Sequence, residues 1–359
     1  MIEIEVNINA RTIAEAVHLA VEAEASGARQ IGVWDSPAAF ADCWTTLGAL
    51  SQRISTIPIG VAVTNPLTRH PVVTASAIAA LANTAAGGVF LGIGTGDSGV
   101  YNLGGRAATR SVLREYVICV KELLGSGRSR WHGRDVFLDQ RPQVKVPLYV
   151  SAHGVKALEL AAEVADGIFL GLGHSQDVVT EVLAVLSRVA SEAGRDPSSI
   201  DLWWNSYAIS VDADSDQAIT ESGWLLAHAA HHLARFGMDG KMVPAEFRDK
   251  VAELGEYYRL THHGRHSSEH REDYIEKAIE LGVWGYLRDR FLIAGNHAEV
   301  RSKLKALHSM GVRKFETGPS VRGLEGIRSV LDLVGEMNRN GVGLRPDDRE
   351  ESQLPGLHA

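Results

Sequence analysis

The stretch GIGTGDSG, residues 92–99, places an acid and two hydroxyls among glycines, directly after the apolar run VFLGIG. Its glycines match the G-x-G-x-x-G spacing of a dinucleotide-binding turn, and its D-S-G tripeptide matches the nucleophile loop of trypsin-like proteases. The dinucleotide turn belongs to the first strand–helix unit and needs an acid at the end of the next strand. Here the stretch follows the fourth apolar run, and the nearest acids, Glu115 and Glu122, fall inside a helical pattern. Neither of these two functions fits the context of the stretch, since a trypsin-like site also needs an all-β scaffold.

Polar or small residues follow several other apolar runs in the same way. Such residues often only cap the next helix, and Ser36 and Ser98 taken singly fit that explanation. Polar residues at the ends of five strands favour a ligand site instead. They are Asp35 and Ser36 in VWDS, Thr64 and Asn65 in VAVTNP, Thr95, Asp97 and Ser98 in GTGDS, Ser151 and His153 in VSAHG, and Asn205 in WWNSY.

These residues must be positioned by the short apolar runs that alternate with helical patterns along the chain. Eight runs are each followed by a helical pattern, which is typical of a (β/α)8 TIM barrel, and catalytic groups of such barrels lie at the C-terminal ends of the strands. A doubly wound sheet with an appended helical domain is the alternative. The eight runs are IEIEVNI, QIGVWD, STIPIGVAVT, VFLGIG, PLYVSA, GIFLGL, LWWNSYAISV and RKFET.

The chain has 359 residues, about a hundred more than a barrel usually needs. Most of the excess lies at residues 228–290, a His-, Arg- and Glu-rich helical insertion after the seventh run. We predict that residues 1–340 form a single barrel domain that includes this insertion. Residues 341–359 are polar, charged and proline-bearing, so we predict a mobile C-terminal tail.

Composition and charge exclude several classes of partner. The net charge is −8 at pH 7 and no Lys/Arg-dense face is evident, which argues against nucleic acid. No apolar run approaches membrane-spanning length, and MIEIEVNINA lacks the features of a signal peptide. Cys43 and Cys119 fall in separate helical patterns and are typical of buried thiols in a reducing compartment. We predict a cytoplasmic protein whose partner is a small-molecule substrate, with no nucleic-acid or membrane partner.

Three segments in order, GVAVTNPLTRHPVVTASAIAALA, VFLGIGTGDS and VPLYVSAHGVKALELAAEVADGIFLG, resemble the bacterial-luciferase-like superfamily of flavin and deazaflavin oxidoreductases. They most resemble the branch that contains the F420-dependent methylenetetrahydromethanopterin reductases. The resemblance includes FLIAGNHAEVRSKLKALHSMGVRKFETG and is weaker across residues 214–290. It implies a (β/α)8 barrel that holds coenzyme F420, or alternatively FMN, at the C-terminal mouth. It also implies a homodimer, because relatives commonly dimerise through barrel helices.

The resemblance further implies where the cofactor binds. A non-proline cis peptide is expected at Ala62–Val63, behind the cofactor ring. The glycines of GTGDS would leave room for that planar ring rather than for a pyrophosphate. Backbone amides of SAHG would hold the cofactor phosphate at a helix N-terminus, with Lys156 nearby; a loop histidine without a role is the alternative for His153. The expected cofactor-binding residues are Ala62, Val63, Thr64, Thr95, Gly96, Asp97, Ser151, Ala152, His153 and Gly154.

Three residues are the implied catalytic candidates. Asp97 matches the acidic position near the reacting carbon, and it would position or protonate the substrate if burial raises its pKa. Asp35 matches the position that faces the pyrimidine-like end of the ring. Ser36 stands where F420-dependent sugar-phosphate dehydrogenases carry a catalytic His, which argues against alcohol oxidation.

The implied function is therefore hydride transfer between coenzyme F420 and a small organic acceptor with an activated C=C or C=N bond. An FMN-dependent luciferase-like monooxygenase and a non-catalytic flavin-binding protein are the alternatives.

Several histidines and aromatic residues are not interpreted as sites. His228, His231 and His232 have a spacing that a metal cluster would use, but no H-E-x-x-H motif or cysteine pair accompanies them, so we predict no metal site. We interpret them, and the histidines between residues 262 and 270, as solvated or substrate-pocket side chains. Trp203 and Trp204 are expected in the core. Arg69 and His70 are expected to orient a loop and cap the following helix.

Overall fold

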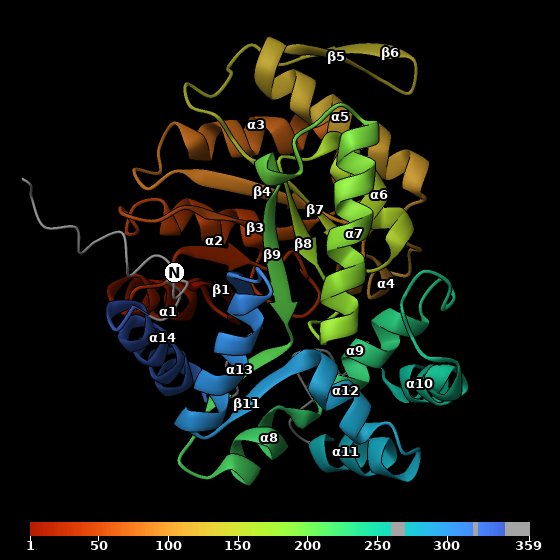
Figure 1. Ribbon diagram of the computed structural model, residues 1–359. Coiled ribbons are helices and arrows are strands. Elements are labelled where there is room, and N and C mark those ends of the chain that lie inside the picture. The colour runs from red at the N-terminus through yellow and green to blue at the C-terminus, as the bar shows by residue number, and fades with distance from the viewer. Residues whose placement is uncertain (260–269, 319–321, 342–359) are drawn as a thin grey trace, which may run out of the picture.

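The computed structural model describes residues 1–259, 270–318 and 322–341. Its centre is a closed barrel of eight parallel strands in the order β1-β12-β9-β8-β7-β4-β3-β2, which confirms the predicted TIM barrel (Figure 1). All eight predicted apolar runs supply a barrel strand. The strands are β1 (Glu3–Ile8), β2 (Gln30–Val33), β3 (Ile59–Thr64), β4 (Val89–Ile93), β7 (Leu148–Ala152), β8 (Gly167–Leu170), β9 (Asp201–Ser206) and β12 (Lys314–Thr317).

Helices surround this barrel, and several begin where the sequence predicts. The Thr12 side chain accepts the Glu15 N–H at 3.2 Å at one start, and His70 accepts the Val72 N–H ahead of Pro71 at another. The predicted capping role of His70 is therefore confirmed. The helices are α1 (Ile13–Ala25), α2 (Cys43–Leu50), α3 (Pro71–Ala82), α4 (Ser98–Tyr101), α5 (Arg110–Ser126), α6 (Val155–Val164), α7 (Gln176–Glu192), the short 3₁₀ helix η1 (Pro197–Ser199), α13 (His297–Ser309) and α14 (Gly323–Arg339).

A hairpin of β5 (Arg128–Trp131) and β6 (Arg134–Phe137) follows α5 and was not predicted. Its turn is His132-Gly133, and both residues have positive φ, as a two-residue hairpin turn requires. The segment RSRWHGRDVF carries four charged residues among its ten. It therefore shows no apolar run from which strands could be predicted.

The run LWWNSYAISV forms two strands rather than the single strand predicted. β9 stays in the barrel, and Trp203 and Trp204 are buried in the core as expected. β10 (Ala208–Val211) leaves the barrel and pairs in parallel with β11 (Leu292–Gly295). Apolar composition alone does not distinguish these two strands, because both are buried.

In the described part of the chain, five helices lie between β10 and β11 and form an additional layer. Four of them, α9 to α12, share a hydrophobic core of their own, which runs from Tyr207 to Leu292. The layer is therefore wider than the predicted insertion at 228–290, whose start falls inside a helix. Figure 1 shows these helices at the end of the barrel toward which the arrow of β9 points. They are α8 (Ser215–Gly223), α9 (Leu225–Ala234), α10 (Ala245–Tyr257), α11 (Arg271–Glu280) and α12 (Trp284–Phe291).

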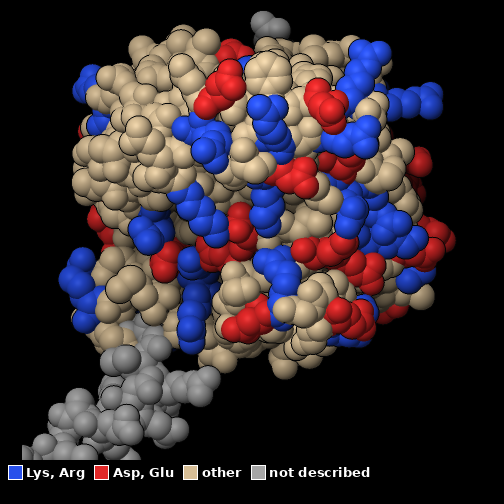
Figure 2. Space-filling view, turned by 90° about the horizontal axis from the view of Figure 1, so that it is seen from above, with Lys and Arg blue, Asp and Glu red and all other residues tan. Residues whose placement is uncertain are grey.

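The surface seen in Figure 2 has Lys and Arg interspersed with Asp and Glu, so that face carries no patch of one sign. Among the described residues, no helix is both long and apolar enough to cross a membrane. Cys43 and Cys119 are free and buried, as predicted. Apart from Gly341, the predicted mobile tail at 341–359 lies outside the described residues.

Candidate active site

A pocket opens at the C-terminal ends of the barrel strands and is bordered on one side by α9. Most of the site residues predicted from the sequence line it. The strand ends that supply them are far apart in the chain, and the parallel barrel brings those ends to one mouth. The predicted residues in its lining are Asp35, Ser36, Ala62, Val63, Thr95, Gly96, Asp97, Ser151 and His153.

Three predicted cofactor-binding residues do not line the pocket. Thr64 is buried, and its Oγ1 donates to Asp35 Oδ2 at 2.6 Å, so it holds that carboxyl in place. Ala152 is fully buried in the core. Gly154 precedes α6 and faces Lys241, whose Cε would lie 3.5 Å from a Cβ at this position.

The N-terminus of α6 is partly used by the chain itself. The Val155 N–H donates to the Gly240 carbonyl at 2.9 Å. Lys156 is exposed and lies in a surface groove with residues of α5 and α7, away from the pocket. Lys241, not Lys156, is therefore the ammonium group beside the start of α6.

The wall formed by β3 and β4 has the shape that the resemblance implies. The peptide bond Ala62–Val63 is cis. A Cβ at Gly94 would lie 3.0 Å from Val63 Cγ2 and 3.5 Å from Ser151 Cβ. Because Gly94 carries no side chain, the space in front of this wall stays unfilled. A planar ring needs such a space to lie flat against the wall.

Gly96 has φ +95°, a conformation that favours glycine. A Cβ there would lie 2.5 Å from Val100 Cγ2. Its carbonyl accepts a hydrogen bond from Arg235 Nη2. Gly96 thus turns the backbone so that Asp97 enters the pocket while the preceding carbonyl faces α9.

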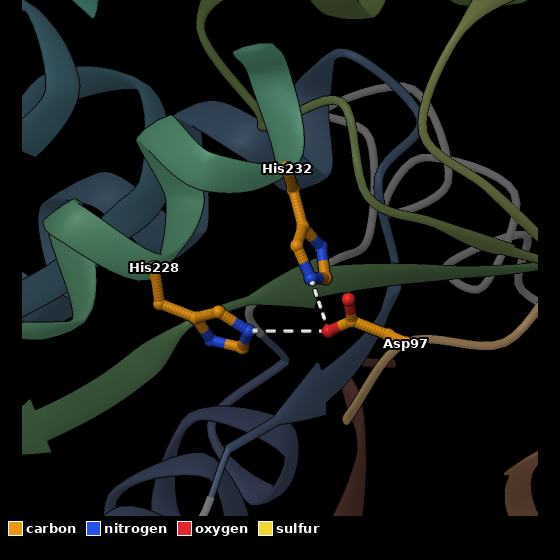
Figure 3. Close-up of side chains that lie close together, drawn as sticks. All are labelled: Asp97, His228 and His232. Atoms are coloured by element: carbon orange, nitrogen blue, oxygen red, sulfur yellow. Dashed lines mark hydrogen bonds and ion pairs between the residues drawn. The ribbon is translucent and has the colours of Figure 1, made fainter. Parts of the chain in front are cut away.

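Asp97 is surrounded by basic side chains of α9 and its C-terminal end (Figure 3). Arg235 Nη1 donates to Oδ1 at 2.9 Å, and His231 Nε2 lies 3.8 Å from the same oxygen. His232 Nε2 lies 3.0 Å from Oδ2, and His228 Nε2 lies 3.9 Å from it. In Figure 3 both imidazole rings point toward this one carboxylate oxygen.

These contacts determine the protonation state of Asp97. Burial by itself would raise its pKa, but His232 and hydrogen bonds from His228, His231 and His232 lower the pKa well below its usual range. Asp97 is therefore a carboxylate at neutral pH. The predicted role as a proton donor depended on a raised pKa and is wrong, while the positioning role stays a prediction.

Three imidazoles of the pocket, those of His153, His228 and His232, are neutral. Burial lowers the pKa of His232 to about 3 and also lowers the pKa of His228 and His153. His232 Nδ1 lies 3.1 Å from the Tyr207 hydroxyl and 3.2 Å from His153 Nδ1. With Nε2–H donating to Asp97, Nδ1 is an acceptor for the Tyr207 O–H.

Arg235 was not predicted as a site residue, and the histidines of α9 were interpreted as solvated or substrate-pocket side chains. Residues 228, 231, 232 and 235 have the spacing i, i+3, i+4, i+7, which places them on one helix face. That face covers the pocket, and His228 and His232 line it, so their interpretation as substrate-pocket side chains stays a prediction that fits this position. Of the second group of histidines, His262, His263 and His266 lie outside the described residues, whereas His270 Nδ1 lies 3.1 Å from Asp273 Oδ2.

Glu316 also lines the pocket and was not predicted as a site residue. Burial raises its pKa to about 7, and hydrogen bonds from Asn7 and Asn205 oppose that shift in part. Asn7 Nδ2 donates to Oε1 at 2.9 Å. An acid in the middle of the strand RKFET was the available signal, since one face of a barrel strand points inward. Glu316 can therefore hold or release a proton near neutral pH.

The remaining catalytic candidates form a polar edge. Burial raises the pKa of Asp35, and the hydrogen bond from Thr64 opposes that shift. Ser36 Oγ and Ser98 Oγ are 2.5 Å apart and both side chains are buried. Asn205, also in the lining, has a buried Oδ1 with no hydrogen-bond partner among the described residues. This edge therefore offers both acceptors and donors to a polar ring edge.

The chain is similar to known oxidoreductases. It is 32% identical over 184 residues to 5,10-methylenetetrahydromethanopterin reductase of Methanolobus tindarius, a match that covers 49% of this chain and 56% of that relative. It is also 32% identical over 188 residues to F420-dependent glucose-6-phosphate dehydrogenase of Microbacterium testaceum, with 49% and 56% covered. The chain thus spans little more than half the length of these curated relatives.

A solved structure shares the fold over a greater length. The coenzyme F420 dependent tetrahydromethanopterin reductase from Methanopyrus kandleri superposes with a TM-score of 0.70 at 23% identity, covering 93% of this chain and 97% of that one. The family model of luciferase-like monooxygenases matches residues 2–314. Together with the barrel and its pocket, this match shows that the chain belongs to the luciferase-like monooxygenase family.

Proposed function

We propose that this protein is an F420-dependent oxidoreductase that transfers a hydride between F420 and a small organic acceptor with an activated C=C or C=N bond. The observation that carries the proposal is the mouth pocket. Ala62, Val63 and Gly94 form a wall of small residues along one side of the pocket, next to a polar edge. The pocket also contains the carboxylate of Asp97, which accepts a hydrogen bond from Arg235.

The residues present fit a planar redox ring. The bare Gly94 position faces Val63 and Ser151, and a side chain there would occupy the space along the wall. The buried Oδ1 of Asn205 lacks a partner among the described residues and is available to a polar ring edge. Ala62, Val63, Thr95 and Gly96 would hold such a ring, and F420 would supply the hydride chemistry when bound.

Residues of the chain itself orient the substrate, supply the proton and exclude water. Asp97 stays ionised between Arg235 and His232, and it orients substrate by accepting hydrogen bonds. Glu316 Oε1 or Oε2 holds the proton that a reduced acceptor needs, because burial raises its pKa to about 7. The layer above, with Tyr207 and Leu225 in the lining, excludes water from the reacting atoms.

The similar proteins support F420 over FMN as the cofactor. The Microbacterium relative and the Methanopyrus structure both carry dependence on F420 in their names. The family as a whole is described by monooxygenase activity, which keeps an FMN-dependent monooxygenase as the second candidate.

Titration of the purified protein with F420 and, separately, with FMN tests the proposal. We expect F420 to quench intrinsic tryptophan fluorescence at micromolar concentration, because Trp34 lines the pocket, and FMN to bind more weakly. Reduced F420 should then be oxidised by electron-poor alkenes or imines. Micromolar FMN binding without F420 binding would favour the monooxygenase. Binding of either cofactor without turnover would favour a non-catalytic flavin-binding protein.

We also propose that the protein is a cytoplasmic homodimer that pairs through its barrel helices. The two free, buried thiols suit a reducing compartment. Sedimentation equilibrium measures the assembly directly. A mass of a single 38.8 kDa chain across the concentration range would refute the dimer.

A further inference from the structure

Two imidazoles and one carboxylate converge at the mouth of the pocket. One ring nitrogen of His228, one of His232 and a carboxylate oxygen of Asp97 all lie within 4.8 Å of one another. His228 and His232 are four residues apart on α9, the spacing by which one helix face supplies two metal ligands. Asp97 comes from the loop after β4, far away in sequence (Figure 3).

From this geometry we propose that Asp97, His228 and His232 form a site for a divalent transition-metal ion such as Zn²⁺, Co²⁺ or Fe²⁺. The proposal departs from the expectation drawn from the sequence, which included no metal. It does not depend on the proposed hydride transfer, because metal binding is measured without cofactor or substrate.

The distances suit a shared ion. Ligand atoms about 2.1 Å from one metal lie roughly 3.0–3.5 Å apart in octahedral or tetrahedral geometry. Here Oδ2 of Asp97 is 3.0 Å from Nε2 of His232 and 3.9 Å from Nε2 of His228. Small rotations of the side chains would place a cation between the three atoms. Two imidazoles and one carboxylate are a donor set that such ions prefer.

Two tyrosine side chains contact the proposed histidine ligands and orient their rings. The Tyr207 oxygen lies 3.1 Å from Nδ1 of His232, so it can accept Nδ1–H once Nε2 binds metal. Tyr258 stacks on the ring of His228, with centroids 5.2 Å apart, and fixes its orientation.

Two neighbouring groups affect the strength of the site. Arg235 donates to Oδ1 at 2.9 Å and leaves Oδ2 directed at the histidines, so Asp97 would be a monodentate ligand. Its positive charge opposes a cation, and we therefore expect weaker binding than at a structural zinc site. His231 Nε2 lies 3.8 Å from Oδ1 and is the nearest additional nitrogen.

The position of the site indicates what the metal would bind next. All three ligands line the pocket, so open coordination positions face it. A small molecule that carries a carboxylate, carbonyl oxygen or imine nitrogen would fill them. The metal would thereby select substrates that carry a donor atom beside the reacting bond.

Titration of chelator-treated, dialysed full-length protein with ZnCl₂ and with CoCl₂ tests the proposal. We expect one equivalent to bind in calorimetry, and Co²⁺ to give a visible absorption spectrum typical of nitrogen ligation. The variants Asp97→Asn, His228→Gln and His232→Gln should each weaken binding by more than about tenfold, since the loss of an outer-layer group alone costs 10- to 100-fold.

Two control variants separate this site from adventitious binding. His18→Gln removes an exposed histidine of α1 and should bind metal as the wild type does. The double variant His262→Gln/His263→Gln removes two histidines that are adjacent in sequence and belong to the second histidine group. It should also bind metal as the wild type does. Loss of the stoichiometric binding in this double variant, or unchanged binding in His228→Gln and His232→Gln, would overturn the proposal.

X-ray absorption on the zinc-loaded wild type keeps the test decisive if a ligand variant fails to fold. We expect scattering from two imidazoles and at least one oxygen. A zinc environment without imidazole scattering, or the absence of any bound equivalent, would also refute the site.

Discussion

Two carboxyl groups in the pocket have pKa values displaced in opposite directions. Asp97 is held ionised by its basic neighbours, whereas burial raises the pKa of Glu316 to about 7. Pairs of acids whose environments separate their pKa values are a common basis for dividing acid and base roles. In the proposed function this division gives substrate orientation to Asp97 and the proton to Glu316.

Asp97→Asn should therefore reduce turnover more than it reduces cofactor binding. The amide keeps the shape of the side chain but loses the charge that balances Arg235. A hydrogen bond to a charged group contributes about 1.5–3 kcal/mol, so we expect kcat/KM to fall at least about tenfold. Steady-state kinetics and F420 titration of the same preparation measure the two effects.

The exposed substitution Asp289→Asn is the matched control and should change neither quantity. Equal losses of turnover and of cofactor affinity in Asp97→Asn would contradict a role in orienting the substrate.

At the scale of elements, one buried arginine joins the additional helical layer to the barrel. Arg290 of α12 is 1% exposed. Its Nε donates to the Leu172 carbonyl at 2.8 Å, in the loop after β8. Its two terminal nitrogens donate to the carbonyls of Met242 and Lys241, at 2.8 and 2.6 Å.

The side chain of Lys241 in turn donates to the carbonyls of His232 and Arg235. This chain of hydrogen bonds holds the end of α9 over the pocket.

Arg290→Met should destabilise the protein by at least about 3 kcal/mol, because it leaves several buried carbonyls without donors, each costing about 1–3 kcal/mol. Urea unfolding followed by circular dichroism measures the change. Arg288→Met, two residues away and partly exposed, removes only a contact to Asp289 and should cost less than about 1 kcal/mol. Similar losses in the two variants would contradict the anchoring role of Arg290.

At the scale of the whole molecule, the barrel interior contains a buried pair of carboxyls beneath the pocket. Glu5 is fully buried, and burial and the nearby Glu316 raise its pKa well above the usual value. Gln30 donates to Glu5 Oε2, and Asn7 donates to Glu316. Both acids thus hold protons in the folded state at a pH where the unfolded chain has released them.

This difference makes stability depend on pH. Because both folded-state pKa values are raised above 4.5, the folded state binds more protons from about pH 4.5 to 7. The contribution of the pair must therefore be present at low pH and be lost as the pH rises through that window. Between pH 4.5 and 7 the free energy of unfolding should fall by about 3 kcal/mol from Glu316 alone.

The double variant Glu5→Gln/Glu316→Gln should lack this fall. Its free energy of unfolding, measured by urea titration at each pH, is compared with that of the wild type, so that other groups with unchanged pKa values cancel. We expect the stability of the wild type relative to the variant to decrease from pH 4.5 to 7. A relative stability that is constant, or that rises with pH, would refute raised pKa values for the pair.

The architecture and most of the rim of the pocket could be predicted from the amino-acid sequence. Eight apolar runs, each followed by a helical pattern, predict a barrel, because a parallel strand must be covered by a helix on its outer face. Asp35, Thr95 and Asp97 were predicted at the mouth because they end such runs, and Ala62 was expected there from the family resemblance; all four line it. The order of apolar and polar residues along the chain was sufficient to predict the strands and the residues that end them.

The surroundings of Asp97 could not be predicted, because they depend on contacts between distant segments of the chain. The histidines of α9 and Arg235 are more than 130 residues away in sequence, and the helices that carry them pack on their own core rather than on the barrel strands. No local pattern specifies which loop such a layer faces. The charge on Asp97, the proton on Glu316 and the convergence of three ligand atoms all follow from burial and from long-range packing. Those are properties of the folded chain, because the environment that shifts a pKa exists only once distant segments meet.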